Sequence, residues 1–252
     1  ASGLAPAESS ILAVSKDGRW VLTEYGQVFA SRLPKDLPVG SQVDDDGNDE
    51  AEESVLDFLK PDEDPVVVRA SPTLEAIVSA IGTDEETRHL VFDAAQIRAL
   101  HVAWHCLDHK RFVLLSGLSG TGKTQLAVAY SKVYCDLLGI PVEQHRCVVA
   151  VSPDWQDPSG LLGYLNPLRQ DDPAFQPEPA LRLVLEAVAD PARPYFLILD
   201  EMNLARVERY FAPFLSAMET KEEIHLHSHD RPVNGVPPKV RWPRNLFIAG
   251  TV

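Results

Sequence analysis

Basic residues and long apolar runs are both scarce in this chain. Its 252 residues include 23 lysines and arginines against 37 aspartates and glutamates, so the formal net charge is −14. A chain this acidic has no overall positive field to attract nucleic acid, although a local basic patch in an assembled oligomer stays open. No apolar run approaches the roughly 20 residues that a membrane-spanning helix needs. We therefore expect no membrane partner.

Cysteine is rare as well. Cys106, Cys135 and Cys147 are odd in number and share no short spacing, which excludes a zinc pattern and a disulfide framework. Buried, small apolar residues are their ordinary role. The first residues show no basic stretch followed by an apolar block, so no secretory signal is visible. These features predict a cytoplasmic protein.

The acidic charge is concentrated in the first quarter of the chain. Residues 1–65 hold 5 basic against 15 acidic residues, whereas the remainder holds 18 against 22. Short β-type runs predict a small β-rich segment over residues 1–43, for which a packing or interaction role is favoured over nucleic-acid binding. Residues 44–70 are acidic and proline-rich and predict a solvated linker.

Residues 71–252 alternate between apolar strand patterns and helical patterns. Strands are expected at 112–115, 146–151, 195–199 and 245–249, with helices at 74–81, 93–109, from 125, from about 179 to 188, and at 204–218. The alternation predicts an α/β fold in which a mostly parallel sheet is sandwiched by helices. The strand at 146–151 is expected to be buried.

Residues 117–124 match the phosphate-loop pattern G-x-x-x-x-G-K-[ST] at every fixed position, between a predicted strand and a predicted helix. Glycines let backbone N–H groups turn around a phosphate, and the helix N-terminus adds its positive dipole. Lys123 is expected to pair with the β- and γ-phosphates, and the Thr124 hydroxyl is expected to bind Mg²⁺. The predicted nucleotide contacts are Gly117, Leu118, Ser119, Gly120, Thr121, Gly122, Lys123, Thr124 and Gln125.

Asp200 and Glu201 follow a second apolar run, Leu197-Ile198-Leu199. In an open α/β sheet, ligands lie beyond the carboxyl ends of the strands. Asp200 is expected to hold the Mg²⁺ that Thr124 binds, and Glu201 to orient the attacking water, with Glu201 and Lys123 as the catalytic residues. The alternative is an acid pair that caps the next helix. Because the acid pair comes after a glycine loop in the same chain, a role in the nucleotide site is favoured over capping. An Asp-Glu pair also favours hydrolysis of the nucleotide over its simple transfer.

Several other residues allow more than one interpretation. Two sets of three histidines are spaced for one helix face or one strand face, and exposed or structural roles are favoured over metal binding for both: His101, His105 and His109, and His225, His227 and His229. Trp155 and Tyr164 suit either packing or contact with a substrate strand. Arg206 and Arg209 suit either a solvated helix face or contact with a neighbouring subunit.

Four stretches together resemble the McrB-like branch of the AAA+ NTPases: residues 117–124, 151–167, 200–208 and 245–252. The resemblance covers roughly residues 74–252, and the second stretch is similar to a helix-2 insertion shared with MoxR- and dynein-related AAA+ groups. It implies an oligomeric ring, typically a hexamer, that hydrolyses ATP or GTP with Mg²⁺. It also implies remodelling of a partner or nucleic acid, with a nuclease subunit, in a restriction or defence system.

The nucleotide and the extent of turnover are left open by these patterns. ATP is the default, since no N-K-x-D guanine motif is present. After Val252 the family would next place a polar sensor residue, then an arginine finger and a helical lid. An arginine finger alone contributes about 10³–10⁵ in rate, so we expect nucleotide binding with weak hydrolysis. The alternative is a nucleotide-gated binding module with little turnover.

Overall fold

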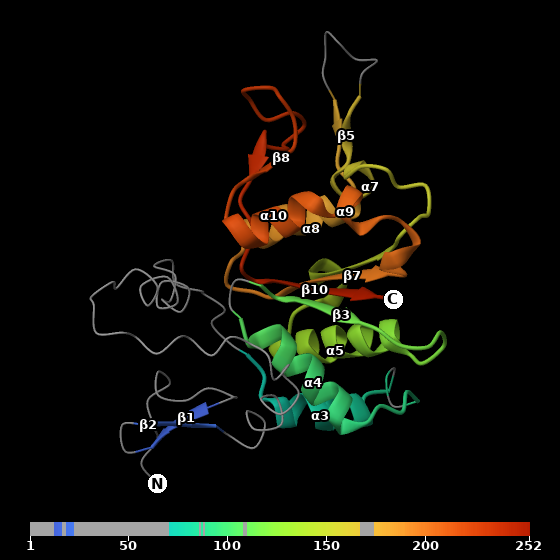
Figure 1. Cartoon of the computed structure of the whole chain (residues 1–252), viewed down its shortest axis with the longest axis vertical. Helices are drawn as coiled ribbons and strands as arrows, with labels where there is room; N and C mark the ends of the chain where they lie inside the picture. The colour runs from blue at the N-terminus through green and yellow to red at the C-terminus, as the bar shows by residue number, and fades with distance from the viewer. Residues whose placement is uncertain are drawn as a thin grey trace, which may run out of the picture. The chain divides into compact units, whose positions relative to one another are not determined.

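The computed structural model of the chain (Figure 1) describes residues 13–16, 19–22, 71–85, 87, 89–107, 110–166 and 174–252. The chain divides into two compact units, Ala1–Pro65 and Val66–Val252. In the first unit, β1 (Ala13–Lys16) and β2 (Arg19–Leu22) pair antiparallel, with Val14 opposite Val21. The other strands expected before residue 43, and the whole linker at 44–70, lie outside the described residues.

A four-stranded parallel sheet organises the second unit. Its strands lie in the order β3 (Phe112–Leu115), β10 (Leu246–Thr251), β7 (Tyr195–Asp200) and β4 (Arg146–Ala150). The two central strands are buried along their length except at Asp200, which is partly exposed. Continuous apolar runs of this kind are typical of a parallel sheet with both faces covered.

Helices pack on both faces of the sheet (Figure 1). Neighbouring residues of β7 serve opposite faces, because side chains alternate along a strand: Phe196 and Ile198 meet one helical layer, and Leu197 and Leu199 the other. The first layer contains α3 (Leu74–Thr83), α4 (Ala94–His105) and α5 (Lys123–Leu138). The second contains α8 (Pro179–Ala189), α9 (Val207–Tyr210) and α10 (Ala212–Thr220). The predicted α/β sandwich is confirmed.

Short elements complete the second unit. They are α6 (Val142–His145), α7 (Ser159–Leu162), the 3₁₀ turn η2 (Met202–Leu204), and the hairpins β5 (Tyr164–Leu165) with β6 (Phe175–Gln176) and β8 (Ile224–His225) with β9 (Lys239–Val240). The Asn234 side chain links the hairpins by accepting a 3.1 Å hydrogen bond from the Phe175 amide. No helix in the described ranges combines the length and apolar character that crossing a membrane requires.

Three expectations for residues 71–252 were wrong in detail. The helix expected at 204–218 is broken into η2, α9 and α10. Pro213 accounts for the break between α9 and α10, because it lacks an N–H and is tolerated only in the first turn of a helix. The strand expected to be buried, β4, lies beside β7 at the edge of the sheet formed by the described strands, and its Val148 is 47% exposed. The helix expected at 93–109 ends at His105.

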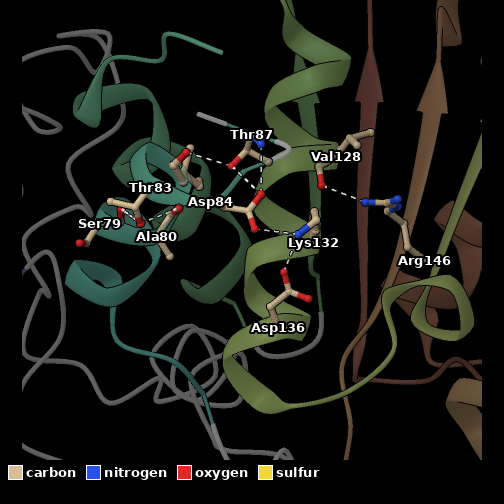
Figure 2. Close-up of polar contacts among 10 residues, drawn as sticks. Ser79, Ala80, Thr83, Asp84, Thr87, Val128, Lys132, Asp136 and Arg146 are labelled. Atoms are coloured by element: carbon tan, nitrogen blue, oxygen red, sulfur yellow. Dashed lines mark hydrogen bonds and ion pairs between the residues drawn. The ribbon is translucent and has the colours of Figure 1, made fainter. Parts of the chain in front are cut away.

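A charged cluster joins the end of α3 to α5, within the helical layer that also contains α4. Figure 2 shows Lys132 Nζ between Asp84 and Asp136, at 2.9 Å and 2.7 Å from their carboxylate oxygens. The other oxygen of Asp84 accepts a 3.1 Å hydrogen bond from the Thr87 amide. Only 16% of the Lys132 side chain and 23% of the Asp84 side chain are exposed. Because little of either side chain is exposed, solvent screens the Lys132–Asp84 ion pair less than it screens a surface ion pair, and their attraction is stronger.

We predict that Lys132→Met destabilises the second unit, because it leaves two neighbouring carboxylates without their shared cation. The expected loss is about 1–2 kcal/mol, between the values for exposed and for fully buried ion pairs. Urea unfolding checks this. The matched control is Lys110→Met, whose partner Glu219 is 65% exposed and whose effect should stay below about 0.5 kcal/mol. Equal losses in both variants would contradict the prediction.

Candidate functional site

The glycine-rich loop joins β3 to α5, at the carboxyl end of the sheet (Figure 1). Gly120 and Gly122 have φ angles of +78° and +80°, in the left-handed region that side chains with a Cβ rarely enter. Gly122 directly precedes Lys123, the first residue of α5, and offers no side chain to cap it. The free N–H groups of the first turn of α5 therefore face the loop.

The Lys123 ammonium lies inside this loop. Its Nζ donates hydrogen bonds of 2.9 Å to the carbonyl oxygens of Gly117 and Leu118. The Thr121 hydroxyl donates a 2.8 Å bond to the same Leu118 carbonyl. The loop is thus folded around a single cation at the N-terminus of a sixteen-residue helix.

The loop meets the acidic strand end directly. The Thr124 hydroxyl donates a 2.6 Å hydrogen bond to Asp200 Oδ1, across 76 residues of chain. Thr124 lies in the first turn of α5, and Asp200 is the last residue of β7. The two residues that the sequence paired as magnesium ligands are therefore in contact.

A third residue, Thr251, completes this cluster, and it was not among the predicted site residues. Its hydroxyl donates a 3.0 Å bond to Asp200 Oδ1 and accepts one of 3.0 Å from the Glu201 amide. Thr251 is 1% exposed and ends β10, the strand between β3 and β7. The available signal was a hydroxyl residue following an apolar run at a strand's carboxyl end, where ligands bind in such sheets.

Glu201 has a backbone conformation that is costly for a residue with a Cβ. Its φ and ψ are 53° and 49°, and such left-handed residues cost about 1–3 kcal/mol and concentrate at functional sites. The amide is held by Thr251, while the side chain is exposed. Glu201 is therefore an exposed acid that directly follows Asp200, the last residue of β7.

The described contacts of the other residues singled out from the sequence are with residues outside this cluster. Trp155 packs edge-on against Tyr210, with ring centroids 5.3 Å apart, so packing is the role that the contacts show. The Tyr164 hydroxyl donates a 3.0 Å bond to Gln176 across the β5–β6 hairpin. Arg209 donates to the Gln156 side chain. With Arg206 and Trp155 it lines a cavity of about 320 Å³.

The histidines are structural where their contacts are described. His101 and His105 stack at 4.3 Å, and His101 Nδ1 lies 2.6 Å from the Tyr130 hydroxyl. Burial, followed by the charge of neighbouring His101, lowers the pKa of His105 to about 4. His227 Nε2 lies 3.0 Å from the Val236 carbonyl oxygen. Within the described ranges, no three His, Cys, Asp or Glu residues form a metal-binding group, and His109 lies outside them.

We predict that Thr251→Val destabilises the protein by about 1–3 kcal/mol, because it leaves the partly buried Glu201 amide without the Thr251 hydroxyl as its acceptor. Thr251→Ser retains the hydroxyl and should recover most of this loss. Thr220→Val, at an exposed helix end, should stay within about 0.5 kcal/mol of the wild type. Urea unfolding of the three variants measures the differences. Stability of Thr251→Val equal to the wild type would rule out a structural role for the hydroxyl.

Comparison with known proteins adds no family to this description. No model of a protein family matches the chain, and no curated protein matches it. What the site can do therefore follows from its own residues and their contacts.

Proposed function

We propose that the chain is a P-loop NTPase of the AAA+ class, which binds a nucleoside triphosphate with Mg²⁺ and hydrolyses it. The observation that carries this proposal is the 2.6 Å contact between Thr124 and Asp200. A glycine-rich turn that matched the pattern by chance would have no reason to place its last hydroxyl on a strand-end carboxylate. A magnesium nucleotide requires that pairing of hydroxyl and carboxylate.

The donor set suits Mg²⁺. Thr124 and Asp200 offer two hard oxygen ligands, and Mg²⁺ in phosphate-transfer sites commonly takes one or two protein ligands with phosphate oxygens and water. A cluster of three acidic or histidine ligands is unnecessary for such a site. When bound, the ion neutralises charge on the phosphates and on the developing transition state.

In this proposal the glycine loop binds the triphosphate. Lys123 carries the positive charge, and its present carbonyl partners, Gly117 and Leu118, are neutral acceptors that a phosphate oxygen outcompetes. The free N–H groups at the start of α5 and the helix dipole favour the same anion. These groups lie on rigid elements, which reduces the ordering cost of binding.

In this proposal Glu201 is the residue that promotes hydrolysis. Its accessible carboxylate is suited to orient and polarise a water molecule for attack on the terminal phosphate. The left-handed backbone at Glu201 and the hydrogen bond from its amide to Thr251 set the direction of that side chain. Thr251 is thereby a positioning residue, which also orients Asp200 through its hydroxyl proton.

The wider assignment rests on the sequence resemblance alone. We propose a cytoplasmic, McrB-like ring, with ATP as the default nucleotide and GTP as the alternative. Its work would be remodelling of a partner or nucleic acid, with a nuclease subunit. Turnover of ATP and GTP measured side by side, with and without DNA, tests this assignment. Tight binding with negligible turnover under all these conditions would favour a nucleotide-gated binding module.

Lys123→Ala should remove most nucleotide binding. A charge-assisted contact contributes about 1.5–3 kcal/mol, which corresponds to roughly 10- to 150-fold in affinity. Calorimetric titration with ATP and Mg²⁺ measures the change. Lys239→Ala removes an exposed lysine of β9 and should bind like the wild type. Wild-type affinity in Lys123→Ala would show that the loop is not the phosphate site.

Glu201→Gln should keep nucleotide binding and stop turnover. An amide of the same shape cannot polarise water as a carboxylate does, so the rate should fall by about 10²–10⁴. Phosphate release and ATP affinity are measured on the same preparation. Glu208→Gln, at an exposed position of α9, is the matched control and should retain wild-type turnover. Undiminished hydrolysis in Glu201→Gln would remove Glu201 from the mechanism.

A further inference from the structure

A second cavity, of about 540 Å³, adjoins the glycine loop. It lies between one side of α4, strand β3 and the first turn of α5, and these elements are neighbours in Figure 1. Thr121, Gly122 and Lys123 form its wall on the loop side. A ligand bound to the glycine loop would therefore lie next to this cavity.

The lining away from the loop is mainly apolar and includes one aromatic ring. Leu100 and Leu126 contribute aliphatic surface, and Phe92 contributes a half-buried ring. An atom of that ring lies 3.5 Å from the position that a Cβ on Gly122 would occupy, so the ring rests against the loop backbone. Mostly apolar walls with a few polar groups are typical of small-molecule sites.

Gln96 supplies the polar group. Its Oε1 accepts a 3.1 Å hydrogen bond from the Asp93 amide, while the Asp93 carboxylate accepts one of 2.9 Å from the Ala95 amide. This capping box at the start of α4 fixes which end of the Gln96 amide is engaged. In the part of the chain that the structure describes, the capping box engages only the Oε1 end, which leaves the two Nε2 hydrogens of this lining residue to donate to a ligand.

We propose that this cavity receives the base of the bound nucleotide, that the base is a purine, and that Phe92 and Gln96 recognise it. The purine rings would stack on Phe92, and a ring nitrogen or carbonyl oxygen would accept from Gln96 Nε2. A double ring offers Phe92 more stacking area than a pyrimidine does. The inference rests on the proposed function, since it takes the triphosphate to occupy the loop.

The test separates the base from the phosphates. ATP, CTP and inorganic tripolyphosphate are titrated with Mg²⁺ into the full chain, as wild type and as Phe92→Leu. The leucine keeps an apolar side chain at the start of α4 but has no aromatic face. We expect ATP to bind the wild type more tightly than CTP. Phe92→Leu should weaken ATP by roughly 5- to 100-fold, the range for loss of one stacked base, and change tripolyphosphate by less than about twofold.

Gln96→Glu tests the donor without disturbing the helix start, because glutamate also completes a capping box. The new charge repels both ATP and tripolyphosphate, so the ratio of their affinities isolates the base contact. That ratio should fall by roughly tenfold, the value of one hydrogen bond to a base. Val91→Ala is the control, since Val91 is 96% exposed and does not line the cavity.

The possible failures are distinguishable. If Phe92→Leu weakens tripolyphosphate as much as ATP, or leaves ATP unchanged, the base does not lie on Phe92 and only this inference falls. Equal wild-type affinity for ATP and CTP overturns purine recognition in the same way. If wild-type protein binds neither ATP nor tripolyphosphate, the proposed function itself fails, and base recognition fails with it.

Discussion

The hydrogen bond between Thr124 and Asp200 is the contact on which the rest of the site depends. It forms only if β3 delivers the glycine loop and β7 delivers the acid at the same edge of the sheet. Parallel strands meet this requirement, because their carboxyl ends lie together. The register of β10 with β3 on one side and β7 on the other sets the distance between the two strand ends. The site geometry is therefore a property of the sheet more than of the loops.

Thr251 connects that geometry to the strained turn at Glu201. One hydroxyl donates to Asp200 and accepts from the Glu201 amide, so it satisfies a partly buried donor and also orients a carboxylate. The left-handed conformation of Glu201 costs about 1–3 kcal/mol, and surrounding structure must hold it in place. A side chain aimed at solvent beside Asp200 contributes nothing to packing. Its backbone strain is therefore better explained by chemistry than by stability.

The sequence predicted those parts that local patterns specify. The loop, the strand before it, the acid pair and the α/β layering all follow from residues adjacent in the chain, and the structure shows the expected strands and layers apart from the exposed edge position of β4. Thr251 was missed because its role depends on the position of β10 between β3 and β7. The order of strands in a sheet cannot be predicted from a local sequence pattern. Phe92, which we propose to stack on the base, gave no signal in the sequence, because one apolar residue before a helix resembles an ordinary packing residue.

The placement of α5 explains how a loop at its start remains aligned with a strand 76 residues away. Lys132 ties the helix to α3 through Asp84, and Arg146 of β4 donates a 3.0 Å bond to the Val128 carbonyl in the helix middle. These restraints act on opposite sides of α5, as Figure 2 shows for the three elements. A helix held at its middle and at Thr124 has little freedom to rotate about its axis. The loop glycines can then adopt conformations suited to an anion without loss of alignment between Thr124 and Asp200.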